Sequence, residues 1–386
     1  METREWNHFI SKFKIMVQFH TLFDEIIESD LNEPEEEYSA LFKYLKDIDI
    51  KSDAILFEAF INLLPMAFYR PSKKNLFSKL KRILTELQIH PYTLFDIFQD
   101  NDNFILYLFE EGLIDLNHLE ERIKNHQNAK FLFYFSPEIF KYKILTEEKL
   151  IKYLKKLLPY RFNDRKLISK ILIRFKEEVI IPRKKGHCLT DIAQIVRNDD
   201  IKLFMQYISQ QPFCIDEIIL DPAFESDEVI RNENNGITVL EYSMCFGSIN
   251  IFKYLWLNHA KYTEKSLQYS IIGGNYDIIH ILEEESIYKF DENAIEMAIR
   301  YQRYEILDYL INTLNVNVET SQLIFYYCKS FNYKKIEEII KKYSEMKQPE
   351  ITNTIIRKAL FNSSGRKRFF YDFLFNLDIN NRVNDI

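Results

Sequence analysis

The chain has 386 residues, of which 47% are hydrophobic, and its 32 phenylalanines and 24 tyrosines supply ample material for a core. Its 7 glycines and 10 prolines are too few for an all-β protein, which needs a turn about every ten residues. The net charge of −7 disfavours general binding to nucleic acids or anionic membranes, because attraction to phosphate requires a positive field.

Neither a membrane helix nor a secretory signal is expected. No apolar run approaches the roughly 18 residues of a spanning helix, and the charged N-terminus METREWNHFISKFK lacks the apolar core of a signal peptide. The four cysteines are scattered and form no CxxC pair or Cys/His cluster, which suits a reducing compartment. We therefore expect a cytoplasmic protein, with the nucleus as the alternative location.

The pattern is helical from the N-terminus to about residue 180. Broad apolar faces at helical spacing occur in LFEAFINLLPMAFY (56–69), where Pro65 should kink or end the helix, and in NLFSKLKRILTEL (75–87). Two helices separated by a polar break, with Gly112 as a C-terminal cap, are expected in PYTLFDIFQDNDNFILYLFEEG (91–112). A break between the halves is expected in the basic, proline-containing IIPRKKGHC (180–188).

The chain repeats itself after residue 188, with a period of 27–28 residues. Each copy has an apolar residue, a small-residue stretch, a glycine position and then an apolar helix. Gly247 and Gly274 occupy the glycine position in the two strong copies; Asp199, Gln302 and Ser330 occupy it in three degraded ones. The five copies cover residues 192–208, 232–257, 267–282, 295–310 and 323–340. A one-residue turn between helices requires a left-handed backbone, which glycine adopts readily.

The stretch NNGITVLEYSMCFGSINIFKYLWL resembles an ankyrin repeat. The likeness comes from Gly236 in the turn, Thr238 and Leu240 at the start of the first helix, and Gly247 between the helices. With the helical PYTLFDIFQDNDNFILYLFEEG, the chain is similar to a family of ankyrin-containing proteins of unknown function, greatly expanded in trichomonad protists. The resemblance covers most of the chain, and a specific motif occurs in residues 234–284. It implies an architecture and a binding role, since these proteins have no assigned activity.

Two departures from the ankyrin pattern concern turns and loops. The period is shorter than the usual 33 residues, so most of the connecting fingers are expected to be trimmed to tight turns. In contrast, residues 210–235 form a long acidic insertion between the first and second copies. Loops longer than about 12–15 residues are usually functional or mobile. The insertion is therefore expected to assist partner binding, and its candidate residues are Asp221, Glu225, Asp227 and Glu228.

No pattern in the sequence indicates catalysis, a cofactor or a metal ion. The eight histidines form no HxxxH or HExxH pair, and no phosphate-binding glycine loop or GxSxG elbow occurs. The four acidic candidates lack EF-hand spacing, so a solvated loop is a better interpretation than a calcium site. The basic clusters 183–185 and 366–368 leave open a nuclear-import address or a patch for an acidic partner.

The predicted fold is all-α: a helical region (1–180) continuing into an ankyrin-like α-solenoid of helix-turn-helix repeats (188–345), with a C-terminal helical cap and tail (346–386). We expect a monomeric, non-enzymatic scaffold or adaptor that binds an unknown protein partner on the concave face of the array. Neither nucleic acid nor a membrane is an expected partner. The alternatives are an enzyme with an unpatterned active site in the N-terminal half, favoured by a buried carboxylate or histidine pair lining a cleft there, and a nuclear regulatory protein addressed by the basic clusters.

Overall fold

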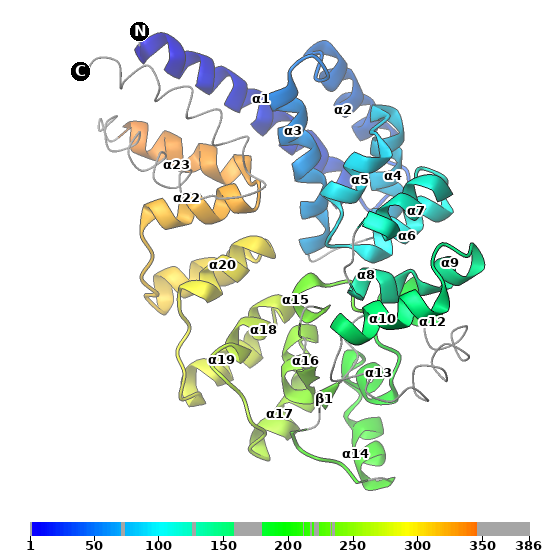
Figure 1. Cartoon of the computed structure of the whole chain (residues 1–386). Coiled ribbons are helices and arrows are strands. Elements are labelled where there is room, and N and C mark those ends of the chain that lie inside the picture. The colour runs from blue at the N-terminus through cyan, green and yellow to red at the C-terminus, as the bar shows by residue number, and fades with distance from the viewer. Residues whose placement is uncertain are drawn as a thin grey trace, which may run out of the picture. The chain divides into compact units, whose positions relative to one another are not determined.

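The computed structural model describes residues 2–70, 74–125, 129–157, 180–210, 212–216, 218–219, 224–231, 233 and 236–345. These residues are mostly helical, as predicted, and their strands amount to one short pair. Contacts divide the chain into two compact units (Figure 1). The first unit joins Met1–Glu86 with the segment that begins at Ile279, and the second unit contains Leu87–Ile278.

The first unit begins with five helical elements. They are α1 (Glu2–Glu28), α2 (Glu35–Asp47), α3 (Ala54–Leu63), the 3₁₀ helix η1 (Leu64–Tyr69) and α4 (Leu76–Leu87). The α-helix ends before Pro65, as expected, because proline has no N–H to continue the hydrogen-bond ladder. Three glutamates in the first turn of α2 lie at the positive end of the helix dipole.

The later segment of the first unit consists of helix pairs. Its elements are α20 (Glu292–Arg300), α21 (Tyr304–Asp308), the π-helix η3 (Tyr309–Thr313), α22 (Thr320–Lys329) and α23 (Tyr333–Glu345). Helix α19 (Tyr276–Glu285) crosses the boundary between the units. The two segments meet at Tyr333, which is fully buried, donates a hydrogen bond to the carbonyl of Ala59 (3.0 Å) and contacts the rings of Phe13 and Phe19 edge-on.

The second unit begins with helices α5 to α12. These are α5 (Pro91–Ile97), α6 (Asp102–Glu110), α7 (Leu116–Asn125), α8 (Ala129–Tyr134), α9 (Ser136–Lys141), α10 (Glu147–Leu157) and α12 (Ile180–Lys185). Helices α5 and α6 confirm the predicted pair of helices, and Gly112 has a positive φ (+78°) just after α6, as a C-terminal cap requires.

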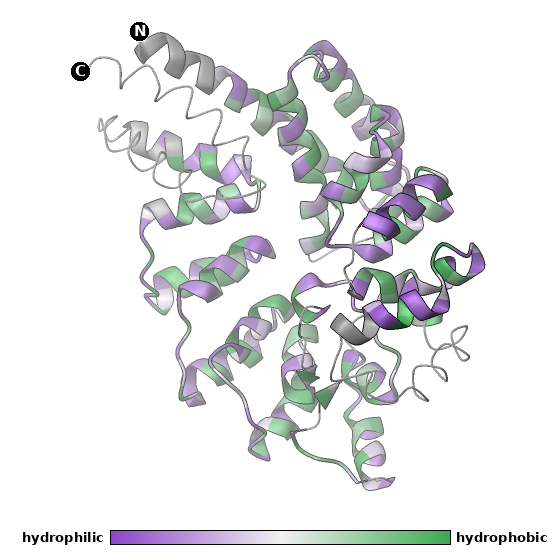
Figure 2. Ribbon diagram, in the orientation of Figure 1, coloured by the Kyte–Doolittle hydropathy of each residue, from purple (hydrophilic) through white to green (hydrophobic). Residues whose placement is uncertain are grey.

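The second unit continues with the helices of the predicted repeats. They are α13 (Asp191–Arg197), α14 (Ile201–Gln210), α15 (Glu228–Arg231), α16 (Val239–Phe246), α17 (Ile249–Leu257) and α18 (Ser266–Gly273). Helix α16 lies between α13 and α18 and packs on both (Figure 1). Two-residue strands, β1 (Ile218–Ile219) and β2 (Ile237–Thr238), pair antiparallel and tie the insertion to the start of α16. Hydrophobic and hydrophilic residues are mixed along the helices, as expected for helices with one buried side (Figure 2).

A left-handed residue lies in the turn of each of the five predicted helix pairs. Gly247 (φ +66°) and Gly274 (φ +70°) confirm the glycine positions, and Asp199 and Gln302 have the same backbone conformation. The fifth prediction is wrong by one residue: Ser330 has φ −97°, and Phe331 is the left-handed residue (φ +51°). The prediction chose Ser330 because a small residue fits a tight turn more easily than a large one. In the structure, packing of the buried Phe331 ring instead holds Phe331 in the left-handed conformation, which phenylalanine rarely adopts.

The division into units differs from the three consecutive segments 1–180, 188–345 and 346–386 expected from the sequence. Packing of α1 and α3 against α23 places both ends of the described chain in one unit. Residues 346–386, including the basic cluster 366–368, lie outside the described residues.

Candidate functional site

Polar side chains tie each helix pair of the second unit to the next one. The carboxylate of Asp199 accepts hydrogen bonds from the backbone N–H groups of Asn250 (3.1 Å) and Ile251 (3.0 Å), at the start of α17. Asn275 links the next two pairs by a different contact, since its Nδ2 donates to the carbonyl of Gly247 in the turn of the preceding pair (3.0 Å). These contacts satisfy backbone groups that helix ends leave unpaired, so they fix the stacking of consecutive pairs.

The start of α16 carries a second tie between pairs. Thr238 and Glu241 form a reciprocal capping box, in which each side chain bonds to the backbone N–H of the other residue. The other carboxylate oxygen of Glu241 accepts from Ser266 Oγ at the start of α18 (2.7 Å). Glu241 therefore joins one helix pair to the next.

The insertion brings a buried carboxylate to α16. Glu225, one of the four candidate residues, has a side chain with no exposed surface. It accepts hydrogen bonds from Tyr242 Oη (2.6 Å), the backbone N–H of Cys188 (2.8 Å) and, in the tautomer with a proton on Nδ1, His187 (2.8 Å). Arg197 Nη1 lies 3.7 Å from the same carboxylate. Glu225 is therefore an internal anchor of the second unit rather than part of a solvated loop.

A second glutamate of the insertion makes a similar contact with α18. Glu233 accepts a hydrogen bond from the ammonium of Lys265, the residue immediately before α18. Burial, with Glu233 as a further cause, raises the pKa of Tyr269 well above its usual range, so the phenol stays a neutral donor. Burial and then Glu225 do the same for the pKa of Tyr242.

The other three candidate residues have different positions. The Asp227 side chain accepts from the backbone N–H groups of Val229 (2.9 Å) and Ile230 (3.3 Å), so it caps α15. Glu228 is the first residue of α15. Asp221 lies outside the described residues. Of the described candidates, Asp227 and Glu228 therefore lie at the start of α15, whereas Glu225 lies against Tyr242 and Cys188.

The insertion also contacts the helices before the repeats. Phe224 packs against Phe133 and Tyr134 of α8, with ring centroids 5.6 and 6.4 Å apart. Arg231 donates to the backbone carbonyl of Asp100, next to α6. The insertion therefore lies between α6–α8 and the side of the repeats that carries Tyr242 and Tyr269, and links the two parts of the second unit.

The basic cluster 183–185 is only partly accessible. Arg183 is 3% exposed and makes a bidentate ion pair with Glu138 (2.6 and 2.7 Å). Lys184 is exposed and pairs with Glu110 (2.7 Å). Arg183 is thus buried in an internal ion pair. An import receptor that binds a basic signal could therefore contact only two of the three cations.

Asp102 is a buried carboxyl group in the N-terminal half. It lies in the first turn of α6 and is 6% exposed. Burial raises its pKa, and the charge of Arg231 opposes that effect. A buried carboxyl with a raised pKa is one of the features that the enzyme alternative requires. Its position at the positive end of a helix dipole is an ordinary structural one.

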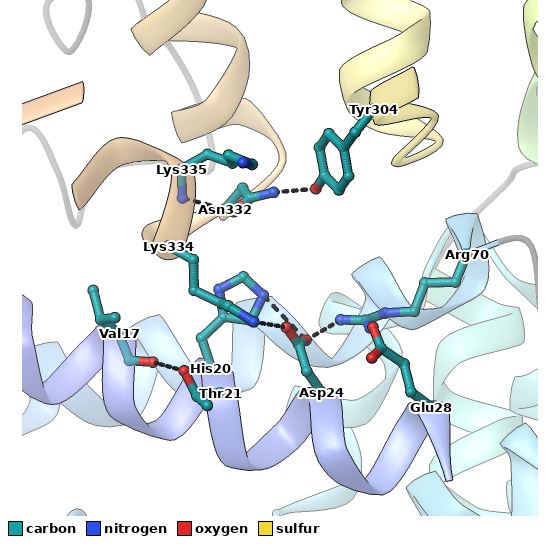
Figure 3. Close-up of polar contacts among 10 residues, drawn as sticks. All are labelled: Val17, His20, Thr21, Asp24, Glu28, Arg70, Tyr304, Asn332, Lys334 and Lys335. Atoms are coloured by element: carbon teal, nitrogen blue, oxygen red, sulfur yellow. Dashed lines mark hydrogen bonds and ion pairs between the residues drawn. The ribbon is translucent and has the colours of Figure 1, made fainter. Parts of the chain in front are cut away.

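The first unit holds a buried ionic cluster around Asp24 of α1 (Figure 3). The Asp24 carboxylate contacts His20 Nε2 (3.3 Å), Lys334 Nζ (2.9 Å) and the guanidinium of Arg70. Burial disfavours the ionised form, but His20, Arg70 and Lys334 outweigh it and hold the pKa of Asp24 well below its usual range. The cluster joins α1 and the residue after η1 to the first turn of α23.

No sequence pattern indicates the Glu225 anchor or the Asp24 cluster as sites. The only sequence feature of Glu225 is its place in a long acidic insertion, and Asp24 lies 310 residues from Lys334 in the chain. A useful signal was present at Tyr242 and Tyr269, which occupy the same position in consecutive copies of the repeat. Within the described residues, no group of three or more His, Cys, Asp or Glu side chains is arranged to hold a metal ion.

Comparison with known families gives one partial match. Residues 257–339 match the model of a domain of unknown function, DUF3447, which occurs in ankyrin-repeat proteins. No curated protein and no solved structure matches the chain. The matched segment contains α18 to α22 and the first half of α23. Every described helix is either too short or too polar to span a lipid bilayer.

Proposed function

We propose that this chain is a non-enzymatic protein-interaction scaffold or adaptor built on degenerate ankyrin-like helix pairs. The observation that carries the proposal is the recurrence of one device: a left-handed turn in each pair, with Asp199 and Asn275 bonding across to neighbouring pairs. Such ties hold a series of helices in fixed register, which is what a repeat protein needs in order to present an extended surface. The DUF3447 match at residues 257–339 covers the third and fourth of these helix pairs and part of the fifth.

The partner-binding surface we propose lies at the end of α17. Leu257 is 74% exposed, and the adjacent Trp256 is half-buried against Tyr262 with ring centroids 4.9 Å apart. Tryptophan and tyrosine dominate the binding energy of many protein interfaces. The side of α16 and α18 next to the insertion is a poorer choice for direct docking, because Glu225 and Glu233 already lie there.

Proximity labelling by the full-length chain in its native cell, followed by mass spectrometry, tests the proposal. Leu257→Asp places a charge in the proposed surface. The labelling of those proteins that bind this surface should fall at least about tenfold, because a few residues at the centre of an interface carry most of its binding energy. Leu203→Asp is the matched control, since Leu203 is also exposed (49%) but lies on α14.

Two results would count against the proposal in different ways. Equal labelling by the Leu257→Asp and Leu203→Asp chains would remove the α17 surface from it. A labelled set no different from that of the free labelling enzyme would contradict the scaffold function itself. Both variants should retain the thermal transition of the unaltered chain, because each replaces an exposed side chain.

A further inference from the structure

Helices α9 and α12 of the second unit are joined close to their C-terminal ends. The bidentate ion pair between Glu138 of α9 and Arg183 of α12 is buried, so it holds the two helices together from the inside. Each helix ends in lysine: Lys141 is the last residue of α9, and Lys184 and Lys185 are the last two residues of α12. The internal pair therefore brings lysines from two separate parts of the sequence to one side of the second unit.

The end of α6 contacts the ends of both helices. Lys184 pairs with Glu110, the last residue of α6 (2.7 Å), and the ring of Phe109 contacts the ring of Tyr142, just after α9, with centroids 6.3 Å apart. Ile181 lies on the same side of α12 as the two lysines, because residues three and four apart share a helix face. These contacts define one surface, which we call the α9–α12 surface and which consists of Lys141, Tyr142, Lys143, Ile181, Lys184 and Lys185.

The α9–α12 surface is positively charged in a chain whose net charge is −7. All of its lysines are exposed. The carboxylate of Glu110 neutralises Lys184, but Lys141, Lys143 and Lys185 form no ion pair with any carboxylate of the described residues. Their charges are therefore available to the carboxylates of another molecule.

A fixed turn holds the aromatic residue of this surface. Lys143 has a left-handed backbone (φ +54°), and its N–H donates to the carbonyl of Phe140 (3.3 Å), so the chain after α9 has a defined conformation. Tyr142 is 37% exposed, and its ring contacts Phe109 on one side and the ammonium of Lys141 (4.8 Å to the centroid). A ring that is already held in place loses little entropy when a partner binds. Tyrosine is also among the residues that contribute most to binding at protein interfaces.

We infer that the α9–α12 surface binds an acidic segment of a partner protein. The lysines attract the carboxylates of that segment, and an apolar residue of the segment packs on Tyr142 and on Ile181, which is 45% exposed. Exposed apolar side chains between the lysines favour a peptide over a nucleic acid or an anionic membrane, both of which a net charge of −7 repels. This surface belongs to helices other than α17, so the inference goes beyond the proposed function and does not depend on it.

A fluorescent peptide with the sequence EEDLFEEDLE tests the inference by anisotropy with the full-length protein at low ionic strength, where surface charges are least screened. Lys143→Glu together with Lys185→Glu should weaken peptide binding at least about tenfold, because two attractions become repulsions. Tyr142→Ala should also weaken it about tenfold, as the loss of an aromatic anchor does. These side chains are exposed, so each variant should keep the thermal transition of the unaltered chain.

Lys43→Glu together with Lys46→Glu is the matched control, because both lysines are exposed on α2 and the change in net charge is the same. This variant should bind the peptide within about twofold of the unaltered chain. A peptide with glutamine and asparagine in place of its acidic residues should bind the unaltered chain at least about tenfold more weakly. Equal losses in the two double variants, or no measurable binding to the unaltered chain, would overturn the inference.

Two other anions identify the class of partner. Single-stranded oligothymidylate and vesicles containing phosphatidylserine should bind the unaltered chain more weakly than the acidic peptide does, and tighter binding of either would overturn the assignment to a protein segment. Leu257→Asp should leave peptide binding unchanged, because Leu257 lies on α17. Peptide binding by the purified chain and labelling in cells are therefore separate results, so a failure of this inference is distinguishable from a failure of the scaffold proposal.

Discussion

At the end of α18, Gly273 lies directly against the backbone of α16. A Cβ at this position would stand 2.0 Å from the carbonyl oxygen of Met244 and 2.8 Å from the backbone nitrogen of Gly247. In the sequence, Gly273 simply precedes the turn residue Gly274. The structure shows that it sets the distance of closest approach between two helix pairs, since backbone atoms give way far less than side chains do.

Gly273→Ala should therefore lower the free energy of unfolding by about 3 kcal/mol, as overpacking of a closed core site does. Gly112→Ala is the matched control. Gly112 lies just after α6 with φ +78°, and an added Cβ meets nothing within 4 Å there. Its cost should be about 1 kcal/mol, the strain of a left-handed alanine. Urea unfolding followed by circular dichroism measures both, and equal effects would show that the Gly273 contact is not tight.

At the scale of the element, the insertion (residues 210–235) has a structural role that its acidic composition does not predict. A long acidic loop is ordinarily a solvated one, and deleting residues 213–230 from such a loop would weaken partner capture without unfolding the chain. The structure instead places Glu225 inside the second unit and Phe224 on α8. We now expect that deletion to destabilise the second unit as well, because it removes the link between α8 and α16.

Glu225→Gln should lower the free energy of unfolding by about 3 kcal/mol. Glutamine keeps the shape of the side chain but leaves Arg197 without its buried counter-charge, and breaking a buried pair of this kind costs about 3–5 kcal/mol. Glu228→Gln, three residues on in the same insertion, is the control and should change stability by no more than about 0.5 kcal/mol. A small effect of Glu225→Gln in thermal or urea melts would mean that the anchor contributes little to folding.

At the scale of the whole chain, the first unit depends on contacts between its two ends. Asp24 and Lys334 form an ion pair, and Tyr333 bonds to Ala59. Contacts of such long sequence separation form only after a large loss of chain entropy. The first unit is therefore expected to fold only once α22 and α23 are present. Substitutions in the Asp24 cluster should lower its free energy of unfolding.

Asp24→Asn should lower the free energy of unfolding by about 3 kcal/mol at pH 7, because Arg70 loses a buried partner. The pKa of Asp24 is depressed in the folded state, so its contribution is complete above the unfolded value near 3.8 and is lost as the pH falls toward the folded value. The difference between the unaltered and Asp24→Asn chains should therefore shrink steadily from pH 5 to pH 2.

Glu28→Gln provides the control for this pH series. Glu28 also pairs with Arg70, but its side chain is 70% exposed, so the change should be within about 1 kcal/mol and nearly constant with pH. A difference for Asp24→Asn that stays constant down to pH 2 would show that the carboxylate is not held ionised by its neighbours.

Local rules were enough to predict the all-α class, the helix end before Pro65 and the left-handed turns at Gly247 and Gly274. These features depend on a few adjacent residues and on helical periodicity, so the sequence contains them directly. The one-residue error at Phe331 arose where packing imposed a backbone that local preference opposes. Helix pairs were predictable for the same local reasons as the turns.

The sequence by itself thus determined the helices, the turns and the repeat period of this protein. Only the tertiary structure decided that Glu225 is enclosed by Tyr242 and Cys188, and that Asp24 meets Lys334. The sequence around an acidic residue does not show whether its carboxylate is solvated or is hydrogen-bonded to a buried tyrosine. Its role depends on which distant side chains the fold places against it, and no local pattern records that.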